Sequence, residues 1–106
     1  MEGIKRLQVR VNGIVQGVGF RPYVYRLART KGLTGWVRNE PEGVLIEIEG
    51  KIKNVEAFLN DLISQSPPLA AIENLAAKET HVRGESGFMI RATISDSPRR
   101  TLMSPD

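Results

Sequence analysis

The residues best suited to chemistry lie in one glycine-rich stretch, Gly13-Ile14-Val15-Gln16-Gly17-Val18-Gly19-Phe20-Arg21-Pro22. It follows a segment with strand alternation and precedes one with helical periodicity, so we expect its three glycines in a strand-to-helix turn. Glycine lets the main chain adopt a positive φ and approach a ligand closely. The first N–H groups of a helix lack intrahelical acceptors and lie at the positive end of its dipole. The stretch therefore predicts an anion site.

We expect the main-chain N–H groups of residues 16–21 to hold this anion. These residues are Gln16, Gly17, Val18, Gly19, Phe20 and Arg21. Arg21 strengthens the prediction, because a cation in the first turn of a helix opposes the dipole by about 0.3–1 kcal/mol. A bound phosphate would resolve the conflict, since a guanidinium binds phosphate oxygens in a bidentate way. The alternatives are a surface cation and a tight turn without a ligand, and a lone glycine-rich turn is a weak signal.

A second polar residue, Asn39, lies at the end of a short predicted strand, just before a turn. Asparagine also favours such positions for conformational reasons alone. Its amide can orient a water molecule but is not a strong base, which disfavours reactions with a poor leaving group. An acyl phosphate suits these residues, because a carboxylate leaves phosphorus without a proton donor. The protein then needs to stabilise charge on the phosphoryl oxygens and to position a water, for which Arg21 and Asn39 are the candidates.

Composition limits the alternatives. With 106 residues, 41% hydrophobic and 25% charged, the chain is typical of one globular domain. It has no cysteine and a single histidine, His81, which excludes thiolate and multi-histidine metal sites. The net charge of +3 is spread along the chain without a basic run, so we expect no nucleic-acid partner. The N-terminal residues do not resemble a secretory signal and no apolar run is long enough to span a membrane, so we expect a cytoplasmic protein without a membrane partner.

Hydrophobic periodicity then gives the elements that position these residues. A helix is predicted over about residues 21–31, because Pro22 suits the first helical position and Gly32 follows the last turn. A second helix begins with Asn54 as its cap, and Ile63 belongs to its apolar stripe. The predicted strands are 5–12, 35–39, 44–49, 72–78 and 88–94.

The order β-α-β-β-α-β-β is typical of a ferredoxin-like α+β sandwich with a short extra strand, in which two helices pack on one face of a mostly antiparallel sheet. We expect this domain to span residues 1–94, and the polar residues 95–106 to be a tail or the beginning of a linker. Within the domain we expect Trp36 in the core and His81 in an exposed loop. Glu47 and Glu49 are expected on a solvated strand face.

Two ordered motifs resemble the signatures of the acylphosphatase family. Gly13–Arg21 resembles the first, and Gly35-Trp36-Val37-Arg38-Asn39 with Gly43 resembles the second. The resemblance covers about residues 5–94. It implies the ferredoxin-like fold and the hydrolysis of carboxyl–phosphate bonds. Arg21 would be the catalytic arginine that binds phosphate, and Asn39 would position the attacking water. No metal or organic cofactor is implied.

Other features resemble the acylphosphatase-like domain at the N-terminus of HypF, the carbamoyltransferase family of [NiFe]-hydrogenase maturation. These are residues 18–24, a short hairpin in which Gly43 leads directly into the next strand, and residues 67–73. This second resemblance implies carbamoyl phosphate as the natural substrate. It also implies downstream domains of the same polypeptide as partners.

Two other functions remain open at this point. The chain could be a non-catalytic module that binds phosphate or carbamoyl phosphate between domains. Residues 17–23 also resemble faintly the aromatic RNA-binding segment of RRM domains, which would require them to lie on a central strand. Pro22 is poorly suited to that position, because it cannot donate a ladder hydrogen bond.

Overall fold

Seven elements follow one another in the order expected from the sequence. The computed structural model describes residues 3–92, and the predicted tail 95–106 lies outside them. The elements are β1 (Ile4–Ile14), α1 (Phe20–Thr30), β2 (Thr34–Glu40), β3 (Gly43–Lys51), α2 (Ile52–Ser64), β4 (Ala71–Thr80) and β5 (Phe88–Ile90). The last strand is shorter than the predicted 88–94: residues 91 and 92 are outside it, and 93 and 94 are not among the described residues.

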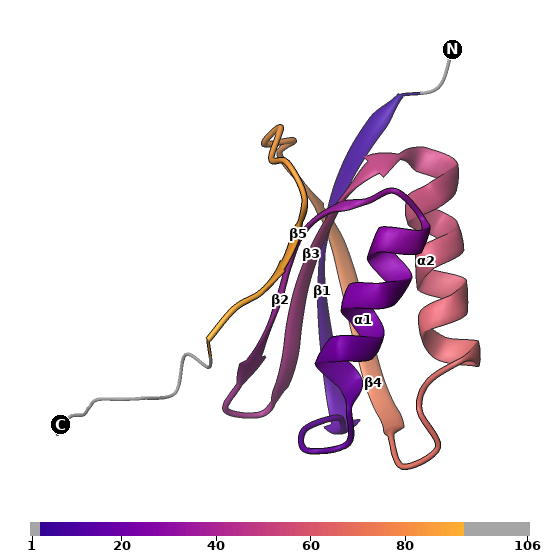
Figure 1. Ribbon diagram of the computed structural model, residues 1–106, viewed down its shortest axis with the longest axis vertical. Helices are drawn as coiled ribbons and strands as arrows, with labels where there is room; N and C mark the ends of the chain where they lie inside the picture. Colours follow the sequence, from indigo (N-terminus) through magenta and orange to yellow (C-terminus); the bar gives the residue numbers. More distant parts are fainter. Residues whose placement is uncertain (1–2, 93–106) are drawn as a thin grey trace, which may run out of the picture.

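The strands form one sheet in the order β4-β1-β3-β2-β5. All neighbouring strands are antiparallel except β2 and β5, which are parallel. Both helices cover the same face of this sheet (Figure 1). The predicted ferredoxin-like α+β sandwich is therefore confirmed, with β5 as the short extra strand at one edge.

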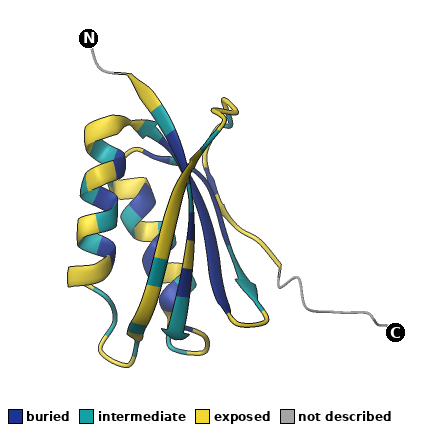
Figure 2. Ribbon diagram, turned by 180° about the vertical axis from the view of Figure 1, so that it is seen from behind, coloured by how far each residue is buried: buried dark blue, intermediate teal, exposed yellow. Residues whose placement is uncertain are grey.

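The hydrophobic core lies between the sheet and the helices. In β1 the residues Leu7, Val9 and Val11 face the helices, because side chains alternate between the two faces of a strand. Buried residues follow the central strand β3 through most of its length (Figure 2). Phe20 and Phe58 complete the core from the helices. The strand and helix periodicities thus converge on a single apolar layer.

The opposite face of the sheet is not the solvated surface expected from the sequence. Arg6 is buried there with its side chain 0% exposed, and it forms ion pairs with Glu47 at 2.7 Å and Glu49 at 3.0 Å. Glu85, in the segment that follows β4, contacts the same guanidinium at 3.1 Å. The prediction of solvated Glu47 and Glu49 was therefore wrong: both are buried. Glu47 accepts hydrogen bonds from Arg6 and Gln8, and Glu49 also accepts them from the main-chain N–H groups of residues 83 and 84, which fold against it.

Trp36 also lies on this face. It is only 6% exposed, as a core residue would be, but it is outside the hydrophobic cluster beneath the helices. Its ring is instead contacted by two guanidinium groups, those of Arg38 at 4.8 Å and Arg91 at 4.7 Å. Cation–π contacts of this kind are favourable on a partly desolvated surface. Trp36 thus helps to hold the segment that contains β5 against β2.

Helix α1 ends as predicted. Gly32 has a φ of 71°, and the N–H groups of Gly32 and Leu33 donate to the carbonyls of Arg29 and Ala28 in a Schellman motif. At its other end, the Tyr23 hydroxyl donates to the carbonyls of Asp61 and Leu62 in the last turn of α2. This contact fixes the first turn of α1 on the rest of the fold.

Helix α2 differs from the prediction in two details. It begins at Ile52 after Lys51, so Asn54 is in its first turn and makes no capping hydrogen bond. Ile63 is 57% exposed, whereas Val55, Phe58 and Leu62 are buried. Neither α1 nor α2, the helices of residues 3–92, has the length and apolarity needed to cross a membrane.

Replacing Arg6 with methionine tests the buried ion pairs. Arg6→Met leaves Glu47 and Glu49 buried without their cation, and breaking a buried pair in this way typically costs about 3–5 kcal/mol. We expect a loss of this size in the free energy of unfolding, measured by urea denaturation. Arg26→Met, at an exposed position of α1, is the matched control. A loss no larger than that of the control would contradict the stabilising role.

Acidification tests the same network. Burial by itself would raise the pKa of Glu49, but hydrogen bonds from the Arg83 N–H, the Arg6 side chain and the Gly84 N–H outweigh it and hold the pKa below its ordinary value of 4.5. The pKa of Glu47 is also lowered, because hydrogen bonds from Gln8 and Arg6 outweigh its burial. The unfolded chain therefore takes up protons first, and the stabilisation present above pH 4.5 is lost as the pH falls through the folded-state pKa values.

Urea denaturation between pH 7 and acidic pH measures this loss. The free energy of unfolding should fall below pH 4.5, the ordinary pKa of glutamate, and the fall should be smaller in the Glu47→Gln/Glu49→Gln variant. Stability that increased on acidification would show that the two carboxylates are not stabilised in the folded state.

Candidate active site

The three glycines of the first motif have different roles. Gly13 is part of β1 rather than of the turn: it lies at a register shift against β4, and a Cβ there would overlap the main-chain oxygen of Ala71. Gly17 and Gly19 have φ values of 74° and 80°, and a Cβ at either position would meet no atom within 4 Å. The expectation of three glycines in the turn was thus correct for two. We call residues 15–19 the glycine turn.

The main-chain N–H groups of residues 16–21 are unpaired in the described part of the chain. Within residues 3–92 no protein acceptor pairs with any of them, and the first helical hydrogen bond of α1 runs from the Tyr23 N–H to the Gly19 carbonyl at 3.2 Å. Gly19 caps the helix and has no side chain that could accept a hydrogen bond. Pro22 is the third helical residue rather than the first, and its missing N–H falls among the donors that a helix leaves unpaired.

Arg21 lies in the first turn of α1 and is partly exposed. The first turn contains no acidic residue, and no carboxylate in the described part of the chain forms an ion pair with Arg21. Its guanidinium therefore adds a positive charge to the positive end of the helix dipole. A helix start with free N–H groups, no cap and a cation favours an anion.

Asn39 lies near the end of β2, on the face of the sheet that the helices cover. It is paired with Val44 and follows Val37 on that face, and both valines are core residues. Its Oδ1 atom is buried and has no hydrogen-bond partner within residues 3–92. Most buried polar atoms in proteins are paired, so an unpaired acceptor is a candidate for binding water or substrate.

The structure brings the glycine turn and the end of β2 together. α1 begins at the same end of the sheet as the β2–β3 hairpin (Figure 1). The Gln16 side chain joins the two directly, because its Nε2 atom donates to the carbonyl oxygens of Glu40 at 2.6 Å and Gly43 at 2.7 Å. The sequence singled out Gln16 only for its main-chain N–H. A side-chain contact across 24 and 27 positions has no local signal in the sequence.

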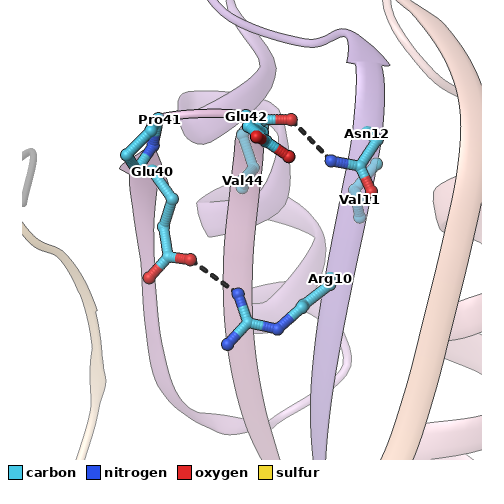
Figure 3. Close-up of a pocket in the computed structure, with 8 residues that line it drawn as sticks. Arg10, Val11, Asn12, Glu40, Pro41, Glu42 and Val44 are labelled. Atoms are coloured by element: carbon cyan, nitrogen blue, oxygen red, sulfur yellow. Dashed lines mark hydrogen bonds and ion pairs between the residues drawn. The ribbon is translucent and has the colours of Figure 1, made fainter. Parts of the chain in front are cut away.

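Two recesses flank the hairpin. One, of about 320 Å³, lies between the glycine turn and the hairpin and is lined by Gly13, Ile14, Val15, Gln16, Pro41, Glu42 and Gly43. The other, of about 330 Å³, is shown in Figure 3 and has Arg10 and Glu40 paired across it at 2.6 Å. Neither is lined by Arg21 or Asn39. An anion at a helix start is held by hydrogen bonds and the dipole rather than by enclosure, so the donors define the site better than the recesses do.

Comparisons with known proteins identify the family. The sequence model of the acylphosphatase family matches residues 7–90. An acylphosphatase of Thermotoga petrophila is 40% identical over 89 residues, which are 83% of this chain and 98% of that protein. This chain belongs to the acylphosphatase family. The domain described here is thus of the kind found in free-standing acylphosphatases.

The chain is also similar to a segment of much larger proteins. Carbamoyltransferase HypF2 of Cupriavidus necator is 41% identical over 103 residues, which are 95% of this chain and 13% of that protein. A crystal structure of full-length HypF in the phosphate- and nucleotide-bound form superposes with a TM-score of 0.84 at 36% identity, covering 88% of this chain and 12% of that one. The resemblance to both kinds of protein, inferred from the sequence, is confirmed.

One other residue and one alternative are settled by the geometry. His81 is exposed just after β4, as expected. Residues 17–23 lie in the glycine turn and α1 rather than on a central strand, so the RNA-binding arrangement of RRM domains is wrong for this chain.

Orthophosphate tests the anion site directly. In a ¹⁵N–¹H NMR titration we expect the main-chain signals of residues 16–21 to shift most. Arg21→Gln should weaken binding by at least about tenfold, because a hydrogen bond to a charged group contributes about 1.5–3 kcal/mol. Arg26→Gln removes the same charge from an exposed position on the same helix and serves as the control. Equal losses in the two variants would mean that Arg21 acts only through net charge.

Proposed function

We propose that this chain hydrolyses acyl phosphates at the start of α1, with Arg21 and Asn39 as its catalytic residues. The observation that carries the proposal is the set of unpaired N–H groups of residues 16–21, at the same end of the sheet as the buried, unpaired Oδ1 atom of Asn39. The N–H groups and the Arg21 guanidinium are donors, and Asn39 Oδ1 is an acceptor. Together they match a phosphoryl group and the water that attacks it.

The donors stabilise the reacting phosphoryl group. Its oxygens carry negative charge through the transition state, and fixed N–H groups with a guanidinium bind that charge without reorganising. Arg21 offers parallel N–H donors that match two phosphoryl oxygens. Binding at this site also resolves the conflict between Arg21 and the helix dipole. The unfavourable cation in the free protein thus becomes part of the binding energy.

Asn39 positions the nucleophile. Its Oδ1 atom accepts a hydrogen bond from a water molecule and orients the water oxygen toward phosphorus. The water oxygen then forms a bond to phosphorus while the bond from phosphorus to the acyl oxygen breaks. The carboxylate leaves with the electron pair, and the protons of the water go to the phosphate product and to solvent. Since a carboxylate needs no proton on leaving, no general acid is required.

The natural substrate that we propose is carbamoyl phosphate. It is a small anionic acyl phosphate, and relatives that match 95% and 97% of the chain are named carbamoyltransferases. Because the chain spans only 13% of the HypF2 protein, the further proposal is that it acts as one domain of a HypF-type protein, with the rest of that polypeptide as its partner. A cytoplasmic location is part of the same proposal and rests on the sequence alone.

Replacing Asn39 with alanine tests the assignment of roles. Asn39→Ala should lower kcat by about 10²-fold with both benzoyl phosphate and carbamoyl phosphate, since the water is no longer held in line. The inhibition constant of orthophosphate should change by less than about threefold, because the phosphate donors remain. Initial rates of substrate loss at a series of substrate and orthophosphate concentrations measure both quantities.

The matched control is Asn60→Ala, at an exposed position on α2. It should leave kcat and phosphate inhibition unchanged. Full turnover by Asn39→Ala would refute the water-positioning role. A wild-type chain that bound both acyl phosphates and hydrolysed neither would instead be a non-catalytic anion-binding module.

A further inference from the structure

The Gln16 side chain holds both strands of the β2–β3 hairpin. Its Nε2 atom donates to the carbonyl oxygens of Glu40 and Gly43, at 2.6 Å and 2.7 Å. These two residues are the last pair of the β2–β3 ladder. A primary amide has two N–H donors on one nitrogen, so a single side chain satisfies a carbonyl from each strand.

The carbonyls that Gln16 holds belong to the immediate neighbours of the predicted water site. Glu40 follows Asn39 in β2, and Gly43 precedes Val44, which is the cross-strand partner of Asn39. Gln16 itself is in the glycine turn, among the residues whose N–H groups are unpaired. One side chain therefore connects the anion donors to the strand end that carries Asn39.

We infer that Gln16 is a positioning residue, whose side-chain amide sets the distance between the anion-binding N–H groups and the Oδ1 atom of Asn39. The inference rests on the proposed function and adds a second role to the main-chain donor expected at this position. Without the amide, the phosphoryl group and the water would each still have their own partners. They would no longer be held at a fixed separation, and in-line attack is sensitive to displacements of about 1 Å.

The hairpin does not depend on Gln16 for its existence. Asn12, at the other side of Gly13, donates its Nδ2 hydrogen to the carbonyl of Glu42 at 2.5 Å (Figure 3). The ladder from Thr34↔Glu49 to Glu40↔Gly43 also remains. Gln16 is exposed, so its replacement leaves no cavity. Loss of its amide is therefore expected to affect the alignment of the site more than the stability of the fold.

A double-mutant cycle with Asn39 tests the inference. Gln16→Met keeps an unbranched side chain of similar length and removes both donors. We expect it to lower kcat for benzoyl phosphate by about tenfold to hundredfold, with the inhibition constant of orthophosphate within about threefold of the wild type. In the Asn39→Ala background the same substitution should change kcat by less than about twofold, because the group that it positions is already absent.

Two further variants make the test specific. Gln16→Leu is a second uncharged replacement that lacks the donors, so it should show the same loss and the same dependence on Asn39. Gln8→Met removes an equivalent amide, which donates to Glu47 at 3.0 Å on the opposite face of the sheet, and should leave kcat unchanged. Thermal unfolding of each variant measures any loss of stability separately.

Equal fold-losses with and without Asn39 would overturn the inference, as would a parallel loss of orthophosphate binding or an equal effect of Gln8→Met. Each of these outcomes would refute the positioning role of Gln16 and leave the proposed activity of the wild-type chain unaffected. A wild-type chain without turnover would refute the proposed function, and the positioning role would fall with it.

Discussion

The register of β2 against β3 determines which chemistry each face of the sheet can carry. Asn39 is paired with Val44, and Val44 with Val11, so these three side chains form one row beneath the helices. The period of side chains in a strand is two, and a slip of one residue would exchange the faces. Asn39 would then point to the charged face, away from the start of α1, and Arg38 and Trp36 would point toward the helices. The candidate site exists only in the observed register.

The two ends of α1 differ in how well they follow the usual rules of helix capping. At the C-terminal end, Gly32 takes the left-handed conformation and the last carbonyls are paired in a Schellman motif. At the N-terminal end there is no side-chain cap and no acid, and Arg21 opposes the dipole. The unsatisfied end cannot be attributed to a lack of packing, because Phe20 and Tyr23 are buried there. Natural sequences depart from local consistency mainly at functional sites, and this end of α1 is such a departure.

The sequence predicted the parts of the fold that depend on local patterns. The order of elements and the end of α1 at Gly32 both follow from periodicity and turn chemistry. What it missed depends on contacts between distant residues. Glu47 and Glu49 resemble a solvated strand face until Arg6 and residues 83–85 are placed against them.

Local reasoning also failed where two local explanations compete. Asparagine is a preferred N-cap residue, which favours Asn54 as the cap of α2. The helix begins earlier, however, directly after β3, and Lys51 is its N-cap residue. Gly13 fits a turn as well as a strand, and only its contact with the main chain of Ala71 shows why glycine is needed. The contacts of the Gln16 side chain were missed for the other reason, namely that they join residues distant in the sequence: its acceptors lie in the hairpin.

The buried ion pairs of Arg6 and the candidate site lie at different places on the sheet. Along β3, Glu49 and Val44 are five positions apart, which corresponds to about 16 Å of extended strand. They also face opposite sides of the sheet. The Arg6 guanidinium, at 2.7 Å from Glu47 and 3.0 Å from Glu49, offsets part of their negative charge and so reduces their repulsion of an anion at the start of α1. The acidic network can therefore stabilise the sheet without weakening a site that depends on positive potential.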